Sequence, residues 1–231
     1  MTDIQEKFQI LMEELHKKYE VPNLIGESSE IIFILESPHI EELFYDAPIS
    51  GLSGGTMTKA LFGQENKIPL GRVVKDFLIQ NNDALVSESK ELDHLNKIGI
   101  MNICRIPMQK AAYIHSKTIE KHGMFNSEKF DGIIELIEHI RKKNKDFYKD
   151  ESKNILQKII LDTFSASLRE LKDKKLYLVP CGKTAEKFFK LSGVSNPNWT
   201  IVEGIPHPSY NSWAREKYLV EIQNLKDLMK K

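Results

Sequence analysis

The sequence predicts an α/β protein, a three-layer α/β/α sandwich with a central, mainly parallel four-stranded sheet and a helical insertion. Two observations support this fold class. Short apolar runs rich in β-branched residues recur four times along the 231 residues, as expected for strands buried on both faces. Helical patterns lie between and after these runs, and such alternation favours a parallel sheet covered by helices on both sides.

The elements follow in order along the chain. Apolar residues at helical spacing predict an N-terminal helix over residues 1–20, which ends before Pro22. Strands are predicted at 31–35, 98–103, 176–179 and 200–202. Further helices are predicted at 57–62, 73–80, 130–142, 155–171, 184–191 and 215–228.

The stretch from about 108 to 175 shows no strand pattern and carries more Lys and Arg than Asp and Glu, which predicts a helical insertion. Its basic run 141–145 is open to two interpretations, a phosphate contact or a solvated helix end. No repeat and no linker rich in Gly, Ser or Pro interrupts the chain, so residues 1–231 are expected to form a single domain.

Composition excludes several classes of protein. Hydrophobic residues make up 41% and charged residues 29%, which is unlike collagen-like or wholly disordered chains. The net charge is zero, so any polyanionic partner needs a local basic patch. Only Cys104 and Cys181 are present, and two thiols cannot build a disulfide scaffold or a four-thiolate metal cluster. We expect two buried, reduced thiols.

The N-terminal segment alternates charged and apolar residues and contains no continuous apolar stretch of signal-peptide or membrane-spanning length. We therefore expect a cytoplasmic protein with no membrane partner. We also expect a monomer.

In an open parallel sheet, ligands bind beyond the carboxyl ends of the strands. Polar residues follow the predicted strands at these ends: Glu36, His39, Asn102, Arg105 and His207. A carboxylate, an amide and an imidazole are the groups needed to orient a water, read a polar heterocycle and stabilise a departing anion. Each also has a structural alternative. Glu36 could cap a helix or pair with a lysine, Asn102 could bond a loop, and His207, between two prolines, could bond turn carbonyls.

These residues stand in a recognisable order: the segments 36–38, 48–54, Asn102, 182–185 and 207–209. This order resembles the uracil-DNA glycosylase superfamily over most of the chain from Ile31 to about Trp213. The resemblance implies a parallel four-stranded sheet between helices and hydrolysis of the bond that joins a flipped base to its sugar, in repair or in attack on modified foreign DNA. It implies DNA as the partner, and no metal or other cofactor.

The resemblance also implies roles for individual residues. Glu36 and His207 would be catalytic, Glu36 by positioning the water and His207 by donating a hydrogen bond to the leaving base. Asn102 would read the polar edge of the base, in a pocket that includes Ile49, Tyr45 and His39. Residues 210–213 would form a loop that enters the duplex. DNA contacts are expected from Ser50, Gly51, Ser209, Tyr210, Asn211 and Lys183.

The sequence departs from the family pattern at three places. Leu35 and His39 flank the first motif where glycines are usual, and Ile49 stands where an aromatic residue usually stacks on the base, a role that Phe44 or Tyr45 could take. Residues 27–46 contain six acids and no Lys or Arg, a charge that would repel DNA unless other residues compensate. The excised base is therefore open, with uracil and modified bases as candidates.

Two alternatives remain. One is a binding module of the same fold that recognises a base or nucleotide without cleaving it. The other is a serine α/β-hydrolase, because residues 51–55 also fit the G-x-S-x-G pattern with Ser53 as nucleophile. That pattern needs a strand leading directly into the serine, and Pro48 stands just before it.

Overall fold

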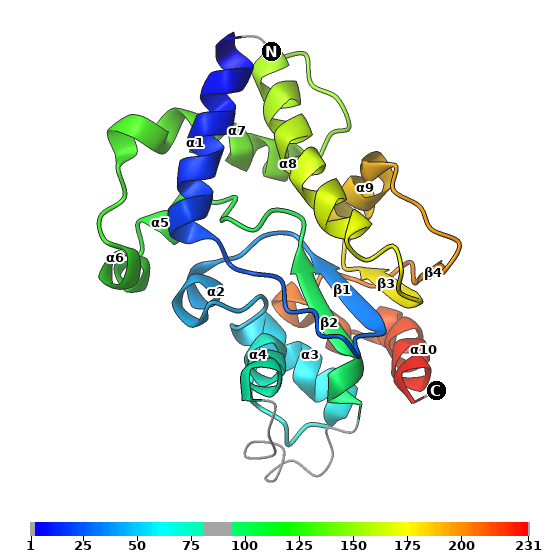
Figure 1. The fold of residues 1–231 in the computed structure, drawn as a ribbon. Coiled ribbons are helices and arrows are strands. Elements are labelled where there is room, and N and C mark those ends of the chain that lie inside the picture. Colours follow the sequence, from blue (N-terminus) through cyan, green and yellow to red (C-terminus); the bar gives the residue numbers. More distant parts are fainter. Residues whose placement is uncertain (1–2, 81–93, 231) are drawn as a thin grey trace.

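A parallel β-sheet lies at the centre of the molecule (Figure 1). The computed structural model describes residues 3–80 and 94–230. Its strands are β1 (Ile31–Leu35), β2 (Ile98–Asn102), β3 (Leu176–Pro180) and β4 (Trp199–Ile201). They are ordered β2-β1-β3-β4, and all neighbouring pairs are parallel. The predicted sheet is confirmed, and each strand bound lies within one residue of its prediction.

The central strand explains why its sequence is apolar throughout. All five residues of β1 are buried, and they alternate between two hydrophobic cores. Ile32 and Ile34 belong to the core on one face, whereas Ile31, Phe33 and Leu35 belong to the core on the other. Because side chains alternate along a strand, a strand covered on both faces needs an apolar residue at every position.

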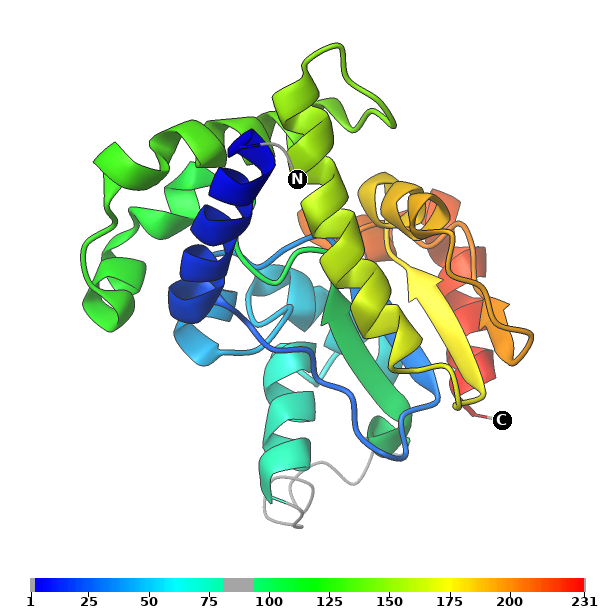
Figure 2. The same ribbon diagram turned by 45° about the horizontal axis from the view of Figure 1, so that its top comes forward.

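Helices cover both faces of the sheet, as Figures 1 and 2 show from two directions. The core on one face contains residues of α1 (Asp3–Tyr19), α7 (Ser127–Lys143), α8 (Glu151–Arg169) and α9 (Lys183–Ser192). The core on the other face contains residues of α3 (Leu52–Phe62), α4 (Leu70–Gln80) and α10 (Leu219–Met229). This arrangement is the three-layer α/β/α sandwich that the sequence predicts.

The stretch from 108 to 175 is helical, as expected, and holds α5 (Lys110–Tyr113), α6 (Ser116–His122), α7 and α8. The N-terminal helix, predicted over 1–20, runs from Asp3 to Tyr19 among the described residues and packs on this region. Phe8, Met12 and Leu15 are its buried contacts to the shared core. The insertion is thus tied to the sheet by α1 as well as by its own helices.

Helix bounds differ most from the prediction at α3, which begins at Leu52 rather than at 57. Gly54 is buried in the first turn of this helix, and a Cβ there would overlap the Ile49 carbonyl oxygen. The absent side chain therefore permits close packing of the helix on the preceding loop. The shorter elements are α2 (Ile40–Tyr45) and the 3₁₀ turns η1 (Leu95–Lys97), η2 (Ser209–Ala214) and η3 (Glu216–Tyr218).

Candidate functional site

A cavity of about 590 Å³ lies at the carboxyl ends of β1 and β2, beneath the loop that follows β4. Glu36 enters it from the end of β1, Asn102 from the end of β2 and His207 from the β4 loop. Of the five residues predicted to gather at this edge of the sheet, Glu36, His39, Asn102 and His207 line the cavity, whereas Arg105 does not. Parallel strands end at a common edge, so the sheet itself brings β1 and β2 residues together.

Glu36 is fixed by its backbone and by a charged neighbour. The Cys104 N–H donates to the Glu36 carbonyl at 3.1 Å, which continues the β1–β2 pairing past the strand ends. Its side chain is 16% exposed and forms an ion pair with Arg141 of α7, in which Nε donates to Oε1. The carboxylate is thus held at the cavity wall by the helical insertion.

Asn102 presents a hydrogen-bond donor without a partner. The residue is 3% exposed, and its backbone N–H bonds the Asn23 Oδ1 at 3.3 Å. Its side-chain Nδ2 has no partner among the described residues, and the same holds for Oγ of Ser37, which also lines the cavity. Buried polar atoms are nearly always paired, so two unpaired ones at one cavity indicate a site for a ligand that carries acceptors.

His207 is oriented by the turn that follows it. The Ser209 N–H donates to His207 Nδ1 at 3.2 Å, and Ser209 Oγ lies 2.9 Å from the same atom. Nδ1 therefore accepts, and the neutral ring carries its proton on Nε2. Burial lowers the pKa of His207; the Glu36 carboxylate opposes this shift and the Arg141 guanidinium adds to it. The imidazole is thus a neutral donor near neutral pH.

The β4 loop must run back along the strand ends to bring His207 to Glu36, because β4 is the edge strand and β1 is central. Gly182, two residues after the end of β3, makes this path possible. Its N–H bonds the Ile205 carbonyl at 2.8 Å, and a Cβ at this residue would lie 2.8 Å from His207 Cβ. Its φ of +86° also favours glycine.

Several other predicted site residues line the same cavity: His39, Ile49, Gly51, Ser209 and Tyr210. Ile49 is 4% exposed and has a φ of +53°, which is an outlier for a β-branched residue. Backbone strain of this kind persists only where the surroundings impose it and often marks functional sites. Burial lowers the pKa of His39, as do the charges of Arg141 and His115.

Two predicted site residues lie beside the cavity, and two lie elsewhere. Ser50 and Asn211 line an adjoining groove, where the Ser50 hydroxyl is engaged with the Ala47 carbonyl at 2.7 Å. Tyr45 lines neither hollow, and the Arg72 guanidinium covers its ring at 4.1 Å. Lys183 lines neither and is exposed at the start of α9. Sequence spacing alone cannot tell which side of a helix faces the cavity.

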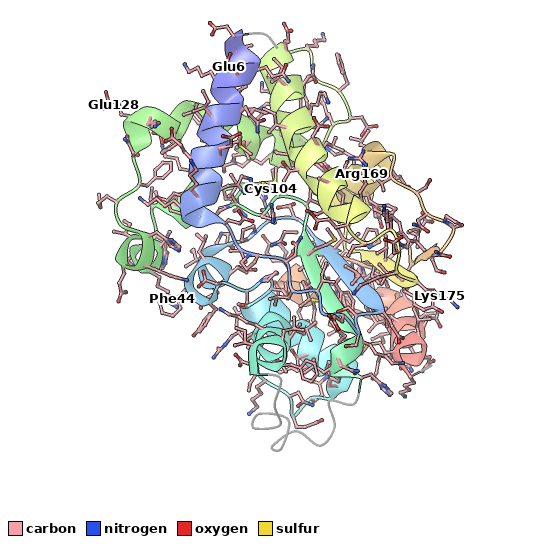
Figure 3. The ribbon with its side chains drawn as sticks, in the orientation of Figure 1. Glu6, Phe44, Cys104, Glu128, Arg169 and Lys175 are labelled. Carbon is pink, nitrogen blue, oxygen red and sulfur yellow. The ribbon has the colours of Figure 1, made fainter. Side chains whose placement is uncertain are left out.

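The expected aromatic base platform and duplex loop are also corrected in part. Phe44 lies on the outer side of α2 and does not line the cavity (Figure 3). Trp213 is 1% exposed and packs near Phe33 in the core, so it is not available to a DNA strand. Tyr210, in contrast, is 88% exposed at the cavity rim. Arg105 points away from the cavity and pairs with Glu20 at 2.7 Å.

The sequence leaves the basic run 141–145 open to a phosphate contact or a solvated helix end, and it predicts no role in the cavity for Arg141. The structure turns Arg141 inward onto Glu36. The acidic stretch 27–46 is compensated in the same way by cations of the insertion. Lys117 pairs with Glu41 at 2.6 Å and Lys121 with Asp46 at 2.6 Å. Positive side chains of the insertion thus neutralise part of the negative charge of residues 27–46.

Ser53 lines the cavity but does not stand on a strand-to-helix turn. The segment before it is α2 followed by the loop 46–51, and Ser53 is the second residue of α3. The hydrolase alternative requires a strand that leads straight into the nucleophile, and this geometry is absent at Ser53.

The two cysteines are free and buried, as expected, and burial raises the pKa of the Cys104 thiol to about 12. Among the described His, Cys, Asp and Glu side chains, no group of three or more could hold a metal ion. No helix within residues 3–80 and 94–230 has the length and apolar character to cross a membrane.

Comparisons with known proteins add no assignment to this geometry. No family model, no curated protein and no solved structure matches the chain.

Proposed function

We propose that the protein is a DNA glycosylase that hydrolyses the bond between a flipped, carbonyl-bearing base and its deoxyribose. The observation that carries this proposal is the meeting of three groups in one cavity: the Glu36 carboxylate, the unpartnered Asn102 amide and the neutral His207 imidazole. They match the needs of glycosidic hydrolysis, in which positive charge develops on the sugar and negative charge on the leaving base.

Glu36 acts on the sugar side of the bond. Arg141 occupies Oε1 of the carboxylate, which leaves Oε2 to accept a proton from a bound water. As the C1′–N bond breaks, its electron pair moves to the base nitrogen and the water oxygen bonds C1′. Glu36 takes the proton of that water, and its negative charge stabilises the positive charge that develops on the sugar in the oxocarbenium-like transition state. Arg141 is a positioning residue, since it acts through Glu36.

His207 and Asn102 act on the base. Nδ1 of His207 is occupied by the Ser209 N–H, so Nε2–H is the donor left for the base as negative charge develops on it. Asn102 Nδ2 and Ser37 Oγ have no hydrogen-bond partner in the described part of the chain, and as donors they suit carbonyl oxygens. A base pulled from the stack loses stacking energy of a few kcal/mol, and this edge recognition compensates part of that cost.

Asn102→Ala is expected to change which base is accepted. Removal of the donor should lower kcat/KM for a carbonyl-bearing base by about tenfold to 100-fold, because an unpaired acceptor costs about 1–3 kcal/mol. A base with an amino group at the same position should lose much less. Competition between paired substrates measures this ratio, and equal losses on all bases would contradict the reading role of Asn102.

The pH dependence follows from His207. Because its pKa is lowered, the ring stays neutral until the pH falls below the ordinary histidine value of about 6.5, and kcat/KM should decline only below that pH. In Arg141→Gln a cation that lowers this pKa is lost, so the acid limb should move to higher pH.

Histidine NMR titration of His207 gives the same shift independently of activity. Lys142→Gln is the matched control, since Lys142 is the next residue of α7 and pairs with Glu138 at 2.7 Å outside the cavity. A His207 pKa that is unchanged in Arg141→Gln, or shifted equally in both variants, would show that Arg141 does not tune the imidazole.

The direct test of the proposal is base release from DNA. Labelled single strands and duplexes would carry uracil, hypoxanthine, xanthine, or hydroxymethylated or glucosylated cytosine, and release would be scored as alkali-sensitive abasic sites. Release of at least one base is expected. Binding of these strands without release from any would instead support the binding module.

A further inference from the structure

Two further hollows continue the cavity along α3. A groove of about 960 Å³ shares Gly51, Ser53 and Tyr210 with the cavity. A second groove of about 940 Å³ shares Thr56, Lys59 and Asn211 with the first. Together the three hollows follow α3 from its first residues past its end at Gly63 and Gln64. They therefore form one continuous concave track that opens from the cavity.

The charge of this track is positive. The two grooves are lined by the cations Lys59, Lys67, Arg72 and Lys226 and by one acid, Glu41, whereas the cavity adds Glu36, Glu42 and Arg141. Glu41 is already neutralised by Lys117. In contrast, Lys59, Lys67 and Lys226 form no ion pair with any described residue, so their charges are available to a partner. A groove lined by free cations attracts a polyanion.

The basic residues of the insertion are less available. Arg141 pairs with Glu36, Lys142 with Glu138 and Lys110 with Asp131. The basic run 141–145 is a candidate phosphate contact on sequence grounds. Its first two residues, Arg141 and Lys142, are already paired with acidic side chains of the protein. The free positive charge next to the cavity lies along α3 instead.

Two exposed side chains stand where the cavity meets the track. Leu52 is 95% exposed and Tyr210 is 88% exposed, and both line the cavity and the adjoining groove. In proteins that bind single-stranded nucleic acids, bases stack on aromatic side chains and the phosphate backbone follows a basic groove. α3 has 11 residues and is about 16 Å long, enough for about five nucleotides at the stacked rise of about 3.4 Å.

We propose that this track binds a single nucleic acid strand, whose phosphates contact Lys59 and Lys67 and whose bases stack on Tyr210 and Leu52. The inference rests on the proposed function for the base that enters the cavity, and it adds the form of the substrate. The exposed side chains of Tyr210 and Leu52 can stack on bases that are not paired in a duplex, so single-stranded DNA is the preferred partner.

Fluorescence anisotropy with a labelled oligothymidine of roughly 12 nucleotides tests the track, since single-strand sites span about 4–16 nucleotides. The double variant Lys59→Glu/Lys67→Glu should lose at least about tenfold in affinity, and its salt slope should fall by about 1.4. The control Lys172→Glu/Lys175→Glu makes the same charge change before β3, at the opposite ends of the strands, where Figure 3 labels Lys175. It should change affinity less than about twofold.

Equal losses of affinity in the two double variants, or no loss in either, would contradict strand binding along the track. Wild-type protein should also bind the single strand at least about tenfold more tightly than the same strand annealed to its complement, and equal or tighter duplex binding would overturn the strand preference. No bond has to break in this assay. Strand binding without base release would therefore overturn only the proposed function, and base release with an unaffected Lys59→Glu/Lys67→Glu variant would overturn only the track.

Discussion

Glu36→Gln is expected to abolish most base release, by about 10²- to 10⁴-fold in the single-turnover rate. The neutral amide keeps the size of the side chain and an acceptor for Arg141, but it cannot take a proton from water or balance positive charge on the sugar. The strand should bind at least as tightly as to wild type, because one negative charge leaves the cavity. Rapid-quench measurement of abasic sites under enzyme excess isolates this step.

Glu138→Gln is the matched control for this change. Glu138 lies on α7 one turn before Arg141, pairs with Lys142 and does not line the cavity. The substitution Glu138→Gln removes one negative charge from the same region and should leave the single-turnover rate within about twofold of that of wild type. Undiminished release by Glu36→Gln would show that the catalytic assignment of Glu36 is wrong.

Gly71→Ala is expected to destabilise the fold by about 3 kcal/mol or more, because overpacking against backbone has no flexible side chain to absorb it. Gly71 is buried in the first turn of α4, and a Cβ there would overlap the Pro48 carbonyl oxygen. The displaced segment would carry Ile49, whose left-handed backbone lines the cavity. At about 2–4 °C per kcal/mol, Tm should fall by about 6–12 °C.

Gly132→Ala is the control for Gly71→Ala. It makes the same substitution, but we expect it to stabilise the fold rather than destabilise it. Gly132 lies within α7, and a Cβ there meets no atom within 4 Å among the described residues. Alanine is favoured over glycine inside a helix by about 1 kcal/mol, so this variant should be slightly more stable than wild type. Calorimetry of both variants decides the point. A Tm for Gly71→Ala at or above that of wild type would contradict the close packing of α4 on the 46–51 loop.

The sheet was predictable because its strands are buried on both faces and so carry continuous apolar runs. The same fact made the site partly predictable, since residues that follow parallel strands meet at one edge. Glu36 and Asn102 are brought together by β1 and β2 alone. His207 was predictable as a rigid turn residue, although its path across Gly182 to the centre of the sheet was not.

Other features depend on contacts between distant segments that leave no local pattern. Arg141 reaches Glu36 from a helix 105 residues further along the chain, and nothing in the sequence around either residue marks the other as its partner. Tyr45 and Lys183 line neither the cavity nor the adjoining groove, because the face that a helix turns to the cavity depends on how the helix packs. The first turn of α3 was missed for the same reason, because Gly54 serves a close contact with the Ile49 carbonyl that the sequence does not show.

We propose that water cleaves a base from its sugar in this cavity, and product analysis in water enriched in heavy oxygen is the sharpest test of that reaction. Wild-type protein would be mixed in excess with a strand that carries the base identified in the release assay. The products would be examined by mass spectrometry. Hydrolysis should release free base without the label and leave an abasic strand with one heavy oxygen at C1′. A strand recovered intact after binding, or a covalent adduct on Ser53, would contradict it.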